Sequence, residues 1–153
     1  MSILDRMAAP PNEPPPGACV RIERPEPGLA VLVLDPPHRK MPVFDRALMR
    51  DLELALGELE RDQKLTGLVV TGRAPTTFVA GADIDAIEAL GSAELATALA
   101  SFGQALFQRL AMLAAYKVAA VGGAVPGGAF EISLACDRIV LAEHPSSRIG
   151  LPE

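Results

Sequence analysis

A glycine-rich segment, residues 118–131, constrains the fold of this chain most, because its character changes three times over a short distance. It begins apolar, becomes rich in glycine and then turns to residues that favour a helix, with Glu131 in the first helical turn. The first N–H groups of a helix have no intrahelical partner, and glycines let a ligand approach the main chain closely. The segment therefore predicts a strand, a loop and a helix start whose backbone N–H groups converge on a negative ligand atom.

The rest of the chain alternates apolar strands with amphipathic helices. Apolar side chains recur every three or four residues in two segments, 45–61 and 92–113, which predicts two helices. Short apolar runs predict strands at residues 19–23, 29–34, 65–71, 117–121 and 138–141, and a short helix is predicted at 130–136. The proline- and glycine-containing turn at 25–28 makes the first two strands a hairpin. This order is typical of an α/β domain with much parallel pairing.

The N-terminal residues 1–17 differ in composition from the remainder of the chain. They are rich in proline and have little apolar surface to bury, which predicts a mobile, disordered leader. Residues 18–153 predict one domain, because a chain of 153 residues with 50% hydrophobic content is large enough for a single core.

Charge and cysteine content narrow the classes of function. A net charge of −5 with 4% aromatic residues lacks both the basic surface and the stacking platform of a nucleic-acid binder. Cys19 and Cys136 are too few for a disulfide framework, which indicates a reducing compartment. No segment is apolar for long enough to span a bilayer, and the N-terminus lacks a secretion signal, so we expect a cytoplasmic protein.

The spacing of residues excludes several common motifs. The glycine segment lacks the pattern of a dinucleotide fingerprint, and no lysine follows its last glycine as in a P-loop. Ser133 lies outside a glycine elbow, and His38 and His144 have no triad or metal-ligand spacing. We therefore expect no nucleotide and no metal. The basic run at residues 38–40 is interpreted as a solvated loop, with a substrate contact as the alternative.

A second loop, residues 78–84, repeats the sequence of an apolar entry, a glycine and a helix start. The two loops supply backbone donors around Ala82 and Gly128, and two carboxylates, Glu131 and Glu153, lie beside glycine-containing turns. This pattern predicts an oxyanion hole with an acid/base pair, because preoriented N–H groups stabilise charge that develops on an oxygen. The alternative is that Glu131 only complements a helix dipole and that Glu153 is a surface residue.

In these motifs the sequence resembles a known family, the crotonase (enoyl-CoA hydratase/isomerase) superfamily. Residues 78–84 look like its first oxyanion loop, 127–131 like its second loop with the first catalytic glutamate, and 149–153 like the segment that carries the second. The spacing of the two glutamates, with Pro145 in the turn between them, looks most like the hydratase portion of the alpha subunit of the fatty-acid oxidation multienzyme complex. The resemblance implies a crotonase-like ββα spiral that is truncated at its C-terminus, since family members continue beyond the position of Glu153.

The resemblance also implies a reaction. The chain would be an enoyl-CoA hydratase (a lyase) that adds water syn across the 2,3 double bond of a 2-enoyl-CoA in fatty-acid β-oxidation, through a thioester enolate. The N–H groups of Ala82 and Gly128 would bind the thioester oxygen. Glu131 would activate the water, and Glu153 would protonate the α-carbon. Further substrate contacts are implied for Lys40, Ala80, Gly81, Asp83 and Gly127. No cofactor is implied, because coenzyme A is part of the substrate, and a homo-oligomer or multienzyme complex is implied for the full-length form.

Two alternatives to the hydratase stay open. An enoyl-CoA isomerase, or other CoA-thioester enolate chemistry, would use the same oxyanion hole with one glutamate. An inactive fragment or interaction module would keep the fold without turnover. Four positions depart from the pattern that the family commonly shows: Pro42 in place of Asn, Gly122 in place of Asn or His, Pro126 in place of Leu, and Ala129 in place of Gly.

Overall fold

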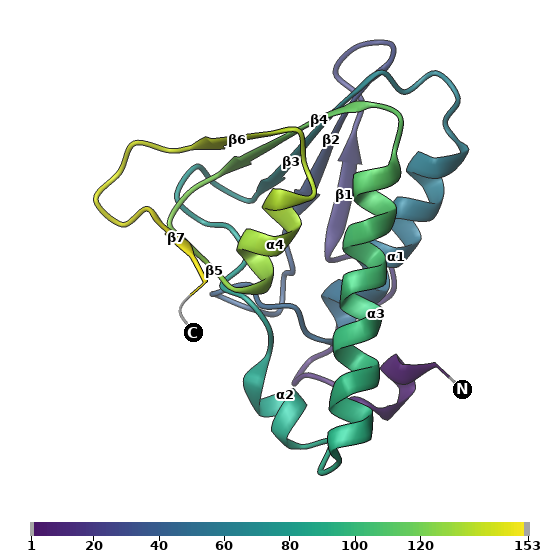
Figure 1. Ribbon diagram of the computed structural model, residues 1–153, viewed down its shortest axis with the longest axis vertical. Coiled ribbons are helices and arrows are strands. Elements are labelled where there is room, and N and C mark those ends of the chain that lie inside the picture. Colours follow the sequence, from purple (N-terminus) through teal and green to yellow (C-terminus); the bar gives the residue numbers. More distant parts are fainter. Residues whose placement is uncertain (1, 152–153) are drawn as a thin grey trace.

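The computed structural model describes residues 2–151 and is built around a five-stranded sheet. Its strands are β1 (Val20–Glu23), β2 (Leu29–Leu34), β3 (Gly67–Gly72), β4 (Tyr116–Val121) and β6 (Arg138–Leu141), in the spatial order β1-β2-β3-β4-β6 (Figure 1). β1 and β2 form the predicted antiparallel hairpin, and every other neighbouring pair in this sheet is parallel. The α/β class with parallel pairing is therefore confirmed.

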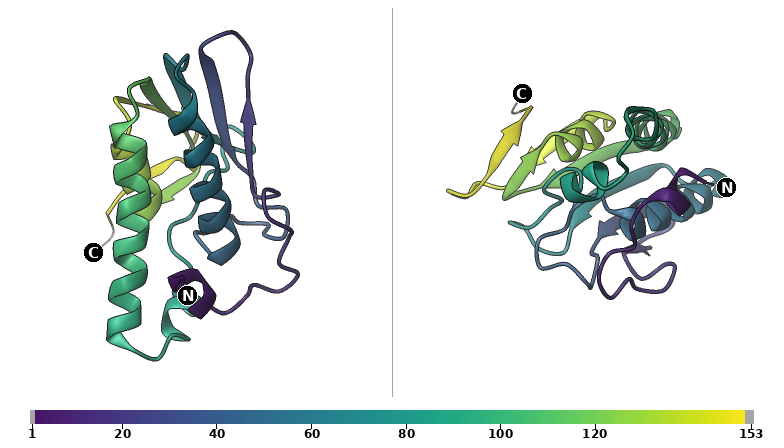
Figure 2. Two further views of the ribbon diagram at one scale, coloured as in Figure 1. Left: turned by 90° about the vertical axis from the view of Figure 1, so that its right-hand side faces the viewer. Right: turned by 90° about the horizontal axis from the view of Figure 1, so that it is seen from below.

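Two long helices, α1 (Arg46–Arg61) and α3 (Ala93–Met112), pack together against one face of the sheet (Figure 2). Both agree with the predicted helices to within one residue at each end. The side chains that α1 buries recur at helical spacing: Leu48, Leu52, Leu56 and Leu59. They meet inward-facing strand residues such as Leu32 and Val70 in one core. Each fully buried leucine contributes about 1.5–3 kcal/mol, so this layer contact is a main source of stability.

Two short helices and two short strands complete the fold around the glycine-containing loops. Helix α4 (Gly128–Leu134) follows the loop, and helix α2 (Ile84–Glu88) follows the first loop. Strand β5 (Ala124–Pro126) pairs in parallel with β7 (Arg148–Gly150) in a second, two-stranded sheet. The sequence predicted neither strand, because three-residue strands carry too little periodicity. Helix α4 also begins before the predicted residue 130.

The N-terminal segment differs from the mobile leader that its composition predicted. Residues Ile3–Arg6 form a 3₁₀ helix, η1, with a capping box between Ser2 and Asp5. Leu4 and Met7 are buried, and η1 packs against α1 and α3. Glu13 accepts bonds from Arg46 and Arg50 of α1, at 3.2 and 3.0 Å. A few well-placed apolar and charged side chains thus anchor a segment whose overall composition suggested disorder. Within residues 2–151, no helix has the length and apolar character needed to cross a membrane.

Candidate functional site

The first glycine-containing loop is held by the chain that leads into α1. The N–H of Ala80 donates to the carbonyl of Pro42, and the N–H of Phe44 donates to the carbonyl of Gly81, both at 2.8 Å. A bridge also pairs Phe44 with Ala82. Gly81 has a φ of +96°, which an L side chain rarely adopts. The loop is therefore fixed on one side by a short run of parallel pairing.

The second loop turns from β5 into α4 at Gly127. Its φ of +51° and its position as N-cap make it the turning residue, and its carbonyl accepts from the N–H of Glu131 at 2.9 Å. The N–H of Gly127 donates to the carbonyl of Gly150 in β7 at 3.1 Å. The small β5–β7 sheet thus holds the loop on the side away from α4.

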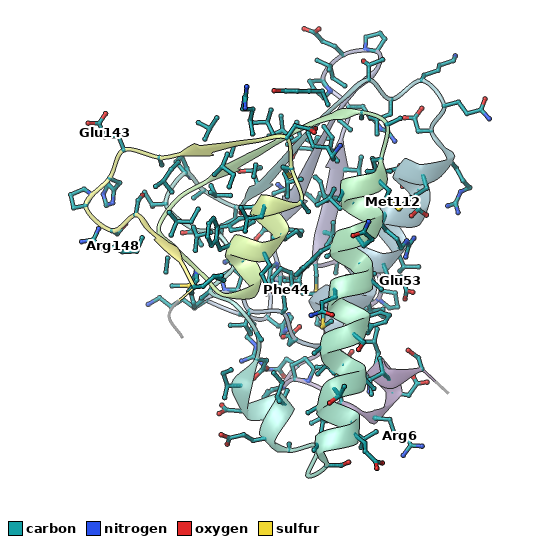
Figure 3. The ribbon with its side chains drawn as sticks, in the orientation of Figure 1. Arg6, Phe44, Glu53, Met112, Glu143 and Arg148 are labelled. Carbon is teal, nitrogen blue, oxygen red and sulfur yellow. The ribbon has the colours of Figure 1, made fainter. Side chains whose placement is uncertain are left out.

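Phe44, which precedes both loops in sequence, contacts both: its backbone pairs with the first loop and its ring lies against the second. A Cβ on Gly128 would lie 3.5 Å from a ring carbon of Phe44 and 3.9 Å from the Oε2 of Glu131. The Phe44 ring also packs on Phe107 of α3, with ring centroids 5.5 Å apart. Figure 3 shows Phe44 between α4 and α3. The glycine at position 128 therefore lets α4 begin directly beside this ring and places the Glu131 carboxylate next to it.

These elements border one cavity of about 230 Å³. Ala82, Gly128 and Glu131 all line it, so the structure brings together three residues that the sequence predicted from separate motifs. The rest of the lining is mostly apolar and comes largely from α1 and α3: Phe44, Met49, Leu52, Ile87, Ala96, Leu99, Ala100, Gly103, Gln104, Leu106 and Phe107. Among the described residues, none accepts a hydrogen bond from the N–H of Ala82 or of Gly128. Within residues 2–151, both N–H groups therefore have no protein acceptor and can donate to a ligand.

The other predicted site residues lie around the cavity or outside the described range. Gly81 and Gly127 shape the two loops but do not line the cavity. The N–H of Ala80 is occupied by its bond to the chain before α1. Lys40 is exposed and is absent from the cavity lining. Glu153, the predicted second glutamate, lies outside the described residues.

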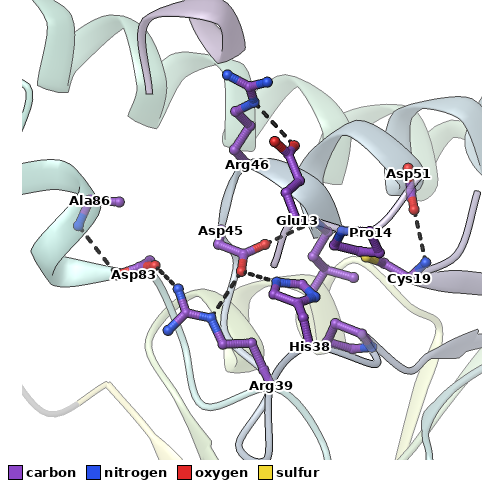
Figure 4. Close-up of polar contacts among 12 residues, drawn as sticks. Glu13, Pro14, Cys19, His38, Arg39, Asp45, Arg46, Asp51, Asp83 and Ala86 are labelled. Atoms are coloured by element: carbon purple, nitrogen blue, oxygen red, sulfur yellow. Dashed lines mark hydrogen bonds and ion pairs between the residues drawn. The ribbon is translucent and has the colours of Figure 1, made fainter. Parts of the chain in front are cut away.

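Asp83 has a structural role that the sequence did not predict. Its carboxylate caps α2 by accepting from the N–H of Ala86 at 3.2 Å, and it forms an ion pair with Arg39 at 2.5 Å. Arg39 also reaches Asp45, with its Nε 3.1 Å from Oδ2 (Figure 4). Asp45 in turn caps α1 by accepting from the N–H of Leu48 at 3.0 Å. One guanidinium therefore joins the starts of two helices.

The basic run at residues 38–40 is not simply the solvated loop that the sequence favoured. The side chain of His38 is only 2% exposed, and its Nε2 lies 2.7 Å from Asp45 Oδ2. Its Nδ1 is buried and has no hydrogen-bond partner within the described part of the chain. The positions of Asp45 and Asp83 before helices are a signal from which their N-cap roles could have been predicted. Their connection through Arg39 depends on tertiary contacts and left no local signal.

Metal ligation finds no support in the geometry of residues 2–151, where no group of three or more His, Cys, Asp or Glu side chains is placed to hold an ion. Asp45 and Asp83, the carboxylates next to the cavity-lining residues Phe44 and Ala82, are instead committed to helix caps and to ion pairs. The arrangement is thus an apolar cavity with two free backbone donors and the carboxylate of Glu131.

Solved structures of known proteins share this fold. The solved structure of Pseudomonas aeruginosa DspI superposes with a TM-score of 0.77 at 28% identity, covering 90% of this chain and 54% of that one. The enoyl-CoA hydratase from Bacillus anthracis gives 0.76 at 25% identity, covering 87% and 50%. The human mitochondrial delta3-delta2-enoyl-CoA isomerase gives 0.76 at 28%, covering 88% and 52%. The fold is therefore that of the crotonase class of α/β enzymes.

The sequence matches are more specific. The family model for enoyl-CoA hydratase/isomerase matches residues 24–153. The fatty acid oxidation complex subunit alpha of Vibrio vulnificus is 40% identical over 128 residues, which are 84% of this chain and 18% of that protein. Its counterpart in Shewanella oneidensis is 34% identical over 137 residues, 90% and 19%. The chain belongs to the enoyl-CoA hydratase/isomerase family, and it spans about a fifth of the length of these relatives and about half of the solved structures.

Proposed function

We infer that this chain carries the thioester-activating part of an enoyl-CoA hydratase site. The N–H groups of Ala82 and Gly128 donate to the thioester carbonyl of a 2-enoyl-CoA. The observation that supports this most is their shared position with Glu131 on one cavity. When water adds at the β-carbon, negative charge moves onto the carbonyl oxygen, and preoriented donors stabilise it. Removing one such donor in other enzymes costs on the order of 10²–10³ in rate.

Glu131 is the group in the described chain that can act as general base. Its carboxylate takes a proton from water as the water oxygen bonds to the β-carbon, and the double-bond electrons move to the thioester oxygen as an enolate. The enolate then collapses and the α-carbon takes a proton from Glu153, which completes syn addition. The apolar lining from α1 and α3 keeps bulk water from this exchange.

The remaining contacts surround the reacting atoms. The backbone of residues 80–83 and Gly127 shape the walls against which the thioester lies, and the exposed Lys40 is available to the phosphates of coenzyme A. The carboxylate of Asp83 serves this site through its cap and its ion pair with Arg39. Coenzyme A belongs to the substrate, so the proposal includes no separate cofactor. Both cysteines are free thiols, which is typical of proteins in a reducing compartment, and we propose the cytoplasm as the location.

The direct test is hydration of crotonyl-CoA by this chain and by its Glu131→Gln variant. We expect the variant to lose about 10²–10⁴ in kcat, because glutamine cannot accept the proton of water. Glu143→Gln is the matched control, since Glu143 lies on a loop at the far edge of the molecule (Figure 3). An unchanged rate in Glu131→Gln would reject the assignment.

A double-bond isomerase is the second candidate. It is favoured by the likeness to the human delta3-delta2-enoyl-CoA isomerase and by Glu131 being the one carboxylate that lines the cavity within residues 2–151. The test is conversion of a 3-enoyl-CoA to a 2-enoyl-CoA by the wild type and by Glu153→Gln. Isomerisation that survives this change while hydration does not would favour the isomerase.

We also propose that the chain associates with itself or docks into a larger complex. Large apolar side chains are exposed around β4, α4 and β6: Tyr116, Leu134, Val140 and Leu141. Exposed apolar side chains of this size favour self-association or docking into a complex when they lie together. Size-exclusion chromatography combined with the hydration assay separates the cases. An inactive, associating chain would fit the fragment or interaction-module alternative, and a monomer with normal turnover would reject it.

A further inference from the structure

We propose that Arg39 is a positioning residue for the oxyanion hole, because it joins the caps of α1 and α2 and so fixes the loop that presents Ala82. This inference rests on the proposed function of that loop. Arg39 does not line the cavity, so it would act through the residues that it holds.

The connection begins with two carboxylates that each use both oxygens. Oδ2 of Asp45 accepts from the Nε of Arg39 at 3.1 Å, while its Oδ1 accepts from the N–H of Leu48. Oδ2 of Asp83 accepts from Nη2 of Arg39 at 2.5 Å, while its Oδ1 accepts from the N–H of Ala86. Each helix start is therefore tied to the same rigid guanidinium, whose planar donors keep a fixed separation (Figure 4).

Each carboxylate directly follows a residue of the site. Asp45 follows Phe44, and Asp83 follows Ala82. Phe44 and Ala82 are themselves paired by a bridge, and the N–H of Phe44 donates to the carbonyl of Gly81. Arg39 therefore links the two residues that directly follow this pair. The pairing in turn sets where the N–H of Ala82 lies. The aromatic ring of Phe44 extends these contacts to Gly128.

Charge explains why a cation is needed at this position. Asp45 and Asp83 are both buried, and two buried carboxylates in one network repel each other unless a cation lies between them. Arg39 supplies that cation from a position that is partly open to solvent, and the ring of His38 also contacts Asp45. The guanidinium of Arg73 donates to the main-chain carbonyl of Arg39 at 2.8 Å and holds the segment in place. A lysine at position 39 would supply the charge but lacks the rigid planar fork that reaches both carboxylates.

The test compares Arg39→Met and Arg39→Lys with Arg109→Met. Arg109 is a matched control, because its side chain is 33% exposed against 31% for Arg39 and it also pairs with two carboxylates, Glu60 and Glu53, away from the cavity. Two measurements are made: steady-state kinetics of crotonyl-CoA hydration, which give kcat and KM, and hydrogen exchange at the amides of Phe44 and Ala80. These amides report the pairing of the loop whether or not the chain turns over.

We expect Arg39→Met to lower kcat by about 10- to 100-fold with a smaller change in KM, since a small misplacement of a donor weakens transition-state stabilisation most. Exchange at Phe44 and Ala80 should become about tenfold faster or more, as local opening becomes easier. Arg39→Lys should fall between wild type and Arg39→Met, and Arg109→Met should match the wild type in both measurements. If Arg39→Met does not fold, Arg39→Met combined with Asp83→Asn removes one uncompensated charge, keeps an acceptor for the α2 cap and should show the same two effects.

Three outcomes would overturn the inference. A raised KM with unchanged kcat would make Arg39 a substrate-binding group. A lower melting temperature with unchanged kcat and exchange would make it a structural ion pair only. Unchanged exchange at both amides would remove the mechanical link itself. Wild-type protein without hydratase activity would instead reject the proposed function, while the exchange measurement would still decide whether Arg39 holds the loop.

Discussion

The carbonyl oxygen of Pro126 lies 3.3 Å from the place that a Cβ on Gly81 would occupy. Pro126 ends β5 in the second loop, and Gly81 lies in the first. The two loops are therefore in contact, and each is shaped by the other as well as by its own sequence. Ala82 and Gly128 follow the two touching residues closely in the chain, so the positions of these two cavity-lining residues depend on this contact.

Gly81→Ala tests this contact. Alanine at a φ of +96° is strained by about 1–2 kcal/mol, and its methyl group would press on the Pro126 carbonyl. We expect Gly81→Ala to lower the melting temperature and to lose more hydration activity than the control variant Gly91→Ala. Gly91→Ala is the control, because Gly91 also has a positive φ, +62°, but nothing lies within 4 Å of its added Cβ. Equal losses in the two variants would mean that backbone strain, and not the contact between loops, decides the effect.

Gly122→Asn tests a position where the resemblance to the family predicts a side chain. A Cβ at Gly122 would lie 2.0 Å from the carbonyl oxygen of Pro75 and 2.8 Å from the Cβ of Ala142. The backbone on one side must move, so we expect a loss of about 1–3 kcal/mol in the free energy of unfolding, typical of overpacking. Chemical denaturation measures it, with Gly150→Ala, where nothing lies within 4 Å, as the control. A neutral Gly122→Asn would show that the segment at Pro75 yields without cost.

Asp51→Asn should make stability depend less on pH. Burial acts to raise the pKa of this carboxyl, but hydrogen bonds from Arg50, Gly17 and Cys19 together hold it below its ordinary value of 3.8. A lowered folded-state pKa means that the carboxylate stabilises the protein above pH 3.8 and loses this contribution as the pH falls below it. The difference in unfolding free energy between wild type and variant should therefore be largest near neutral pH and shrink in acid. Glu26→Gln, at an exposed turn, serves as the control. If the difference in unfolding free energy between wild type and Asp51→Asn grew in acid, the lowered pKa of Asp51 would be contradicted.

The two cysteine thiols should react slowly in the native protein. Burial, followed by the charge of Asp51, raises the pKa of Cys19 to about 12, and burial raises the pKa of Cys136 to about 11. Since the thiolate is the reactive form, little of either is available near neutral pH. We expect a disulfide reagent to titrate both thiols promptly in denaturant and slowly in buffer, with Cys19 the slower. Rapid reaction of both in buffer would show that the protein opens around them.

The success of the sequence-based predictions depends on how local each signal is. The long helices were predicted within a residue because α1 buries leucines at a regular spacing and Asp45 caps it. The strands β5 and β7 were missed because each has only three residues. The docked N-terminal helix was missed because its segment is dominated by proline, while Leu4 and Met7 join the core that distant helices build. For the site, Ala82, Gly128 and Glu131 came from motifs in continuous sequence, whereas the ion pair between Arg39 and Asp83 is a contact across the fold.

The sequence by itself determined the order of the five main strands and of the two long helices, the two turns with glycine, and membership of the enoyl-CoA hydratase/isomerase family. These features depend on the spacing of apolar residues, on helix-capping side chains and on the conformational freedom of glycine, all of which are set by residues close together in the chain. Only the tertiary structure decided that the two loops touch, that Phe44 contacts both of them, and that Arg39 joins two helix caps. Those relationships depend on which apolar faces are buried together, and that choice is made by the whole core at once.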